Sequence, residues 1–135
     1  MTIPLRADRQ TPFREVQEHL LCAATTTVKM FTAQRLIRVS KVEYVNPTGL
    51  TGHASNHWTL TLQKGATVIA TYTTDSDVVG QGTLTANAIV LPTLSATDAN
   101  LVIAVDDVVS LVITKAASAV DLPAGHLVIH GRYVS

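Results

Sequence analysis

Apolar and polar residues alternate over two neighbouring segments, residues 56–64 and 67–74. A period of two is typical of a half-buried antiparallel strand, because successive side chains point to opposite faces of a sheet. Lys64-Gly65 separates the segments and favours a turn, so the two strands are predicted to form a hairpin. Trp58, Leu60 and Leu62 share one face of the first strand, and Val68, Ala70 and Tyr72 alternate with Thr67, Ile69, Thr71 and Thr73 in the second.

Further segments rich in Val, Ile, Thr and Tyr recur between turn residues as far as the C-terminus. They cover residues 25–32, 36–45, 83–86, 88–91, 101–105, 108–114 and 127–134. About eight short strands at regular spacing are typical of sandwiches and barrels. The pattern therefore predicts an all-β fold, an antiparallel sandwich of about eight strands with jelly-roll-like wiring.

The N-terminal part follows a different pattern. Thr11 before Pro12 resembles a helix start, with threonine as the N-cap and proline at the first helical position. Val16 and Leu20 are four residues apart and would form a small apolar stripe on a helix. These signals predict a short helix over residues 13–21.

The domain organisation follows from these segments. Residues 1–24 are predicted to be an N-terminal arm containing the short helix, and residues 25–135 to be the sandwich. A chain of 135 residues is long enough for one domain with a core of its own. It has no apolar run approaching the ~18 residues of a membrane span and no signal-peptide pattern, so a soluble protein is expected.

The charge is low and unevenly distributed. Charged residues make up 15% of the chain, against a typical value of about 25%. This fits either a surface covered by partner subunits or a threonine-rich sandwich face. Residues 1–43 carry seven Lys/Arg and four Asp/Glu, a balance of +3, and residues 44–135 carry three and six, a balance of −3. A net charge of zero argues against nucleic acid as the partner.

Candidate catalytic groups are sparse. Cys22 is the single cysteine and lies in an apolar stretch, so a buried thiol is expected and an intrachain disulfide is excluded. Nearly all the aspartates after residue 44 fall in predicted turns, where this residue type usually caps its own backbone. No phosphate loop, nucleophile elbow or Cys/His cluster is present. The sequence therefore predicts neither an enzyme nor a cofactor.

The histidines do not form a metal-ligand motif. His126 and His130 share one face of the last predicted strand, about 13 Å apart, which is too far for one metal ion. A site would need His57 and His130 to meet across strands, or His130 from three copies to meet on a threefold axis. No metal is therefore expected.

Four stretches between Arg38 and the C-terminus carry a family resemblance. They are residues 39–50 (VSKVEYVNPTGL), 56–60 (NHWTL), 82–87 (GTLTAN) and 122–133 (LPAGHLVIHGRY). Their cadence resembles small β-sandwich decoration (cement) proteins of tailed bacteriophages. The resemblance implies a homotrimer that binds the major capsid protein on the outside of the head, after assembly in the bacterial cytoplasm, and contacts no membrane.

On this interpretation the arm contacts the shell or an adjacent subunit. The residues expected to do so are Arg6, Arg9, Phe13 and Arg14, because a guanidinium pairs well with surface carboxylates. A solvated tail is the alternative for the arm. For the whole chain, the alternatives are the trimeric jelly-roll head of a phage fibre or adhesin that binds host glycan, and a stand-alone carbohydrate-binding sandwich. An aromatic content of 4% disfavours sugar binding, and Trp58 is expected in the core.

Overall fold

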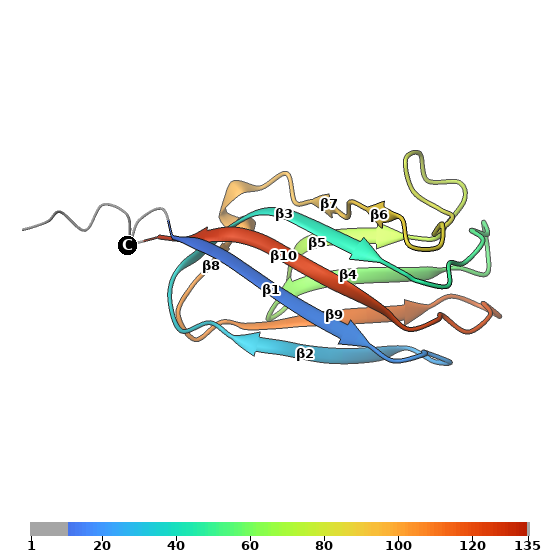
Figure 1. Cartoon of the computed structure of the whole chain (residues 1–135), viewed down its shortest axis with the longest axis horizontal. Coiled ribbons are helices and arrows are strands. Elements are labelled where there is room, and N and C mark those ends of the chain that lie inside the picture. Colours follow the sequence, from blue (N-terminus) through green and yellow to red (C-terminus); the bar gives the residue numbers. More distant parts are fainter. Residues whose placement is uncertain (1–10, 135) are drawn as a thin grey trace, which may run out of the picture.

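Two antiparallel β-sheets face each other in the computed structural model, which describes residues 11–134 (Figure 1). The first sheet has the order β1 (Pro12–His19), β10 (Gly125–Tyr133), β3 (Ile37–Val45) and β6 (Ile89–Val90), and β8 (Val102–Ile103) also pairs with β3. The second has the order β2 (Thr26–Thr32), β9 (Val108–Lys115), β4 (Trp58–Lys64), β5 (Thr67–Thr73) and β7 (Thr93–Leu94). The prediction of an all-β sandwich is confirmed.

Strand pairing is nested along the chain. β1 pairs with β10, β2 with β9, β3 with β8, and β4 with β5, all antiparallel. Consecutive strands alternate between the sheets except for the β4–β5 hairpin, and β1 and β2 are the edge strands on the same side of the sandwich (Figure 1). The other side ends in the two-residue strands β6 and β7.

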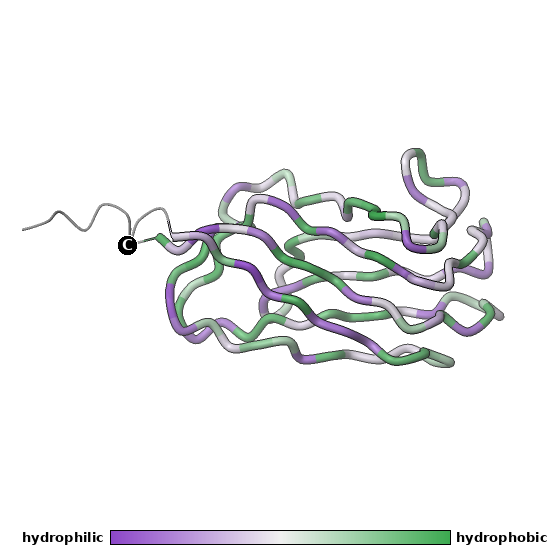
Figure 2. Tube along the Cα trace, viewed as in Figure 1, coloured by the Kyte–Doolittle hydropathy of each residue, from purple (hydrophilic) through white to green (hydrophobic). Residues whose placement is uncertain are grey.

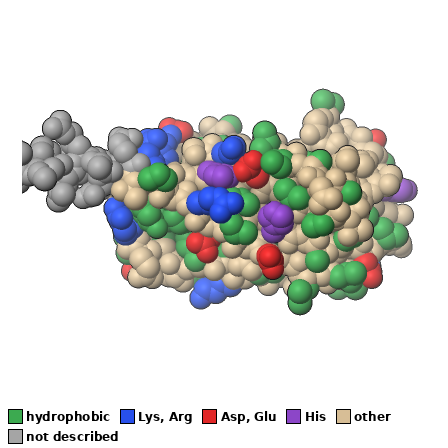
Figure 3. Space-filling view, in the orientation of Figure 1, with side chains coloured by type: hydrophobic (Ala, Val, Ile, Leu, Met, Phe, Trp, Pro, Cys, Tyr) green, Lys and Arg blue, Asp and Glu red, His purple; other side chains and the backbone are tan. Residues whose placement is uncertain are grey.

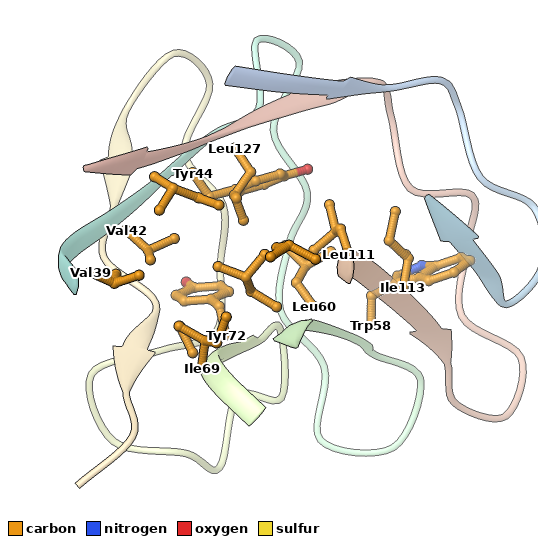
Figure 4. Packing of buried hydrophobic residues seen from close by; sticks show 14 of the residues in the cluster. Val39, Val42, Tyr44, Trp58, Leu60, Ile69, Tyr72, Leu111, Ile113 and Leu127 are labelled. Carbon is orange, nitrogen blue, oxygen red and sulfur yellow. The ribbon is translucent and has the colours of Figure 1, made fainter. Parts of the chain in front are cut away.

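The core lies between the inner faces of the two sheets. Tyr44 and Leu127 of the first sheet point toward Leu60 and Leu111 of the second (Figure 4). Trp58 is fully buried, which confirms its predicted place in the core. Figure 2 shows apolar and polar residues alternating along the strands, as expected when only one face of each sheet is buried.

The predicted helix over residues 13–21 is wrong. Residues 12–19 form β1, which pairs with β10 over its whole length without a register shift. The inward positions of β1 are Phe13, Glu15, Gln17 and His19. Three of these four residues are polar, so the sequence of β1 does not show the alternation of apolar and polar residues that is typical of a strand. The boundary set at residue 24 thus lies in the connection between the two edge strands.

A register shift in the first sheet explains one glycine. Between His130 and Gly131 the pairing of β10 with β3 shifts by one residue, which leaves Ser40 as the extra residue of β3. A Cβ atom at Gly131 would overlap the backbone carbonyl of Arg38. Glycine therefore allows the two strands to approach each other at this point.

Candidate functional site

Of the four residues predicted to contact a partner, the structure describes two, and these lie on opposite faces of β1. Arg6 and Arg9 lie outside the described residues. Phe13 is only 7% exposed, and its ring packs 5.6 Å from that of Phe31 and 5.5 Å from that of Tyr133. The Phe13 ring therefore serves the core rather than a partner. Arg14 points outward from β1 and is exposed.

Charged side chains gather on the outer face of the first sheet (Figure 3). Arg14 of β1 lies opposite His130 of β10, which lies opposite Lys41 of β3. This charged face consists of Arg14, Glu18, Arg38, Lys41, Glu43, His130 and Arg132. It holds four of the eight lysines and arginines of the described residues, so half of their positive charge projects from one side of the sandwich.

Some of these cations are already paired. Glu43 contacts the His130 ring and lies 3.8 Å from the Lys41 ammonium, and Arg38 contacts Asp98 at 2.8 Å. Within the described residues Arg14 and Arg132 form no ion pair. These two guanidinium groups are therefore available for carboxylates on another molecule.

A buried polar cluster closes the end of the sandwich where β1 finishes. His19 is 3% exposed, and its Nδ1–H donates to the Leu20 carbonyl at 2.8 Å. This tautomer leaves Nε2 to accept from the Tyr44 hydroxyl at 2.7 Å. Asn46 donates to the Tyr44 oxygen at 3.2 Å and to the Pro123 carbonyl at 2.8 Å. The cluster thus joins β1, β3 and the loop before β10.

Burial shapes the acid–base behaviour of this cluster. Desolvation lowers the pKa of His19, against the raising effect of its hydrogen bond to Leu20. Desolvation also raises the pKa of Tyr44 to about 12, although the hydrogen bond from Asn46 opposes the shift. Both groups are therefore held in their neutral forms.

The Cys22 thiol lies 3.7 Å from His19 Nδ1, a spacing that suggests a nucleophile beside a base. However, Nδ1 already carries a proton and directs it to the Leu20 carbonyl, to which the thiol also donates at 3.3 Å. The imidazole therefore has no lone pair directed at the sulfur. Burial raises the pKa of Cys22, so this pair lacks the activation of a catalytic thiolate.

We expect a thiol reagent to modify Cys22 slowly in the folded protein. Because the side chain is buried and its pKa is raised, labelling requires a local opening. The rate should be roughly a hundredfold or more below that of the urea-unfolded chain at the same pH. Stopped labelling followed by mass spectrometry measures both rates, and equal rates would contradict a buried thiol.

The remaining histidines are dispersed. His57 Nδ1 lies 4.0 Å from an Asp75 carboxylate oxygen beside the second sheet, whereas His130 contacts Glu43 on the first. The meeting of His57 and His130 that a metal site would need does not occur. Among residues 11–134, no three His, Cys, Asp or Glu side chains are grouped so that they could hold a metal ion.

The sequence pattern did not predict the cluster of His19, Tyr44 and Asn46. The helix assigned to residues 13–21 left no reason to place His19 beside Tyr44, 25 positions along the chain. The one available signal was Asn46 before Pro47, which marks a turn. The Asn46 side chain accepts from the backbone N–H groups of Thr48 and Gly49 in that turn.

All six aromatic side chains contribute to the core. Trp58, Tyr44, Tyr72 and Phe13 are buried, and Phe31 and Tyr133 pack against them while partly exposed. Arg35 covers the Tyr133 ring at 4.3 Å from its centroid. No fully exposed aromatic ring is therefore offered as a platform for stacking on a sugar.

Comparisons with protein-family models, with curated proteins and with solved structures find no match for this chain. The resemblance to decoration proteins therefore stays a prediction from the residues. In the part of the chain that the structure describes, no helix has the length and apolar character needed to cross a membrane.

Proposed function

We propose that this chain is a structural virion protein that binds the major capsid protein on the outer surface of a tailed-phage head and stabilises the shell. The charged face is the observation that carries the proposal. An exposed sheet face on which Arg132 forms no ion pair within residues 11–134 suits an acidic protein surface, since electrostatic complementarity speeds encounter and fixes orientation. The trimer implied by the family resemblance belongs to the same proposal.

The wiring of the sandwich supports a structural role. The nested pairing of β1 with β10, β2 with β9, β3 with β8 and β4 with β5 fits a jelly roll. Jelly rolls occur in viral capsid proteins, and also in lectins and cupins. This is support by analogy of fold, and it is independent of the charged face.

The chemistry of the described residues favours binding over catalysis. The one cysteine–histidine pair lacks a free base, and the aspartates that contact backbone N–H groups, such as Asp75 and Asp107, lie in turns. The burial of the aromatic rings disfavours the glycan-binding alternatives, because sugar sites usually present exposed rings.

The proposal is tested with Arg132→Glu on phage shells that lack the protein. We expect binding about tenfold weaker, which corresponds to about 1.4 kcal/mol, because the substitution places a negative charge on the docking face. Co-sedimentation with the shells at several protein concentrations measures the affinity. The wild-type affinity should also fall with added salt.

Lys29→Glu is the matched control. It makes the same charge change on β2, in the opposite sheet. Its affinity for the shell should stay within about twofold of the wild type. Failure of the wild type to bind any shell would refute the proposed function, and equal losses in both variants would show that only net charge matters.

A further inference from the structure

β1 is a regular edge strand without a bulge. Its eight residues pair with β10 on one side, and no strand of residues 11–134 pairs with it on the other. The second edge strand, β2, is different, because its register shifts between Lys29 and Phe31. A bulge hinders the pairing of a further strand with an edge, whereas a regular edge strand permits it.

The free backbone groups of β1 can be assigned from the register. The Tyr133 N–H donates to the Thr11 carbonyl at 2.9 Å, and the two residues continue the pairing of β1 with β10. Hydrogen-bonded and non-hydrogen-bonded pairs alternate in an antiparallel ladder. The N–H and C=O groups of Arg14, Val16 and Glu18 therefore point away from β10, toward the open edge.

These three residues form a self-complementary row. Arg14, Val16 and Glu18 project from the same face of β1, with Val16 at the centre and opposite charges on either side. In an antiparallel pairing of two β1 strands about a twofold axis at Val16, each Arg14 faces Glu18 of the second copy. Opposite charges directly across an antiparallel pair are stabilising.

We propose that β1 binds β1 of a second copy in this register and joins the two first sheets into one continuous sheet. Arg14 pairs with Glu18 of the second copy on both sides of a central Val16–Val16 contact. Each of these three residue pairs exchanges two backbone hydrogen bonds. The contact is isologous and closed, because it occupies the open edge of both copies.

Neighbouring registers are poorer. The outward-pointing backbone groups of β1 belong to alternate residues. Arg14, Val16 and Glu18 must therefore each lie opposite an even-numbered residue of the second copy. Centring the axis on Arg14 or on Glu18 places like charges face to face, which is destabilising. Centring it between Arg14 and Val16 leaves both charges without a charged partner.

The apolar residues beside this row add burial. Val16 is 42% exposed, and Leu20, which follows β1, is 84% exposed. In the same register Leu20 lies across from Pro12 of the second copy. Burial of these two side chains against the second copy stabilises the contact further.

The test uses charge reversal at the two paired positions. Arg14→Glu and Glu18→Arg each place like charges opposite one another twice, so self-association should weaken at least tenfold. The double variant R14E/E18R restores both pairs and should regain the wild-type association. Analytical ultracentrifugation at micromolar to hundred-micromolar concentration measures all four proteins, and circular dichroism checks that each is folded.

Mixing the two single variants gives the sharper result. The Arg14→Glu chain carries two acids and the Glu18→Arg chain two bases, so the mixture should form heterodimers although neither variant associates alone. The wild type should contain two copies, or six where the proposed trimer also forms through another surface. A monomer, a lone trimer, or a double variant that stays dissociated would overturn the contact. The test of shell binding uses Arg132, which takes no part in this contact, so a lone trimer would leave the proposed function intact.

Discussion

Replacing Trp58 by alanine is expected to lower the free energy of unfolding by about 3–5 kcal/mol. The side chain is fully buried in the core, so its removal leaves a cavity that the two sheets cannot fill. The indole Nε1–H also donates to the Val120 carbonyl at 2.7 Å, which ties the loop after β9 to the core. Urea unfolding followed by circular dichroism measures the change, because the variant has no tryptophan fluorescence.

Two further variants make the result specific. Trp58→Phe keeps an aromatic ring but loses the hydrogen bond, so its cost should be smaller than that of Trp58→Ala. Val120→Ala changes a side chain that is 68% exposed and should alter the free energy of unfolding by less than about 0.5 kcal/mol. A loss below about 1 kcal/mol for Trp58→Ala would place the indole outside the core.

The central strands were predictable because their alternation is local. Trp58, Leu60 and Leu62 are buried in β4 as the pattern indicates. In β5 the pattern fails at one place: Ile69 and Ala70 are both buried, and Val68 is exposed. The register of β4 with β5 shifts between Leu62 and Gln63, which inserts an extra residue. A bulge depends on the partner strand, so the alternation of one segment does not reveal it.

The short strands and the edge strand required long-range information. Residues 83–86 contribute only a single bridge, between Leu84 and Leu50, where a strand was predicted. For β1, Val16 and Leu20 share a face in a strand as well as in a helix, because four is a multiple of two. The pairing with β10, more than a hundred residues away in the sequence, decides between them.

The candidate surfaces follow the same rule. The excess of positive charge in the first 43 residues was visible in the sequence, but its gathering on one sheet face depends on the order β1, β10, β3. Arg14 was predicted as a contact residue and Arg132 was not, although both lie on that face and form no ion pair within residues 11–134. The composition therefore predicted the excess of positive charge, and the strand order determines on which face of the protein this charge lies.

Stability is expected to fall as the pH drops below 6.5, the ordinary pKa of histidine. Burial lowers the pKa of His19 in the folded chain, so the unfolded chain binds the proton first. Its contribution is fully present above pH 6.5 and is lost as the pH falls through the folded-state pKa. The slope contributed by one such group is at most about 1.4 kcal/mol per pH unit. Urea midpoints between pH 5 and pH 8 measure it.

His19→Gln separates the effect of this residue from that of the other histidines. Glutamine keeps a donor and an acceptor but does not titrate, so the dependence of stability on pH below 6.5 should become shallower even if the variant is less stable throughout. An unchanged acid slope in His19→Gln would mean that protonation of His19 does not open the end of the sandwich.

On the alkaline side, the raised pKa of Tyr44, about 12, makes stability fall as the pH rises from 10 toward 12. Tyr44→Phe should reduce that alkaline loss. It should also lower stability near neutral pH by about 1–3 kcal/mol, because His19 Nε2 is left buried without a donor.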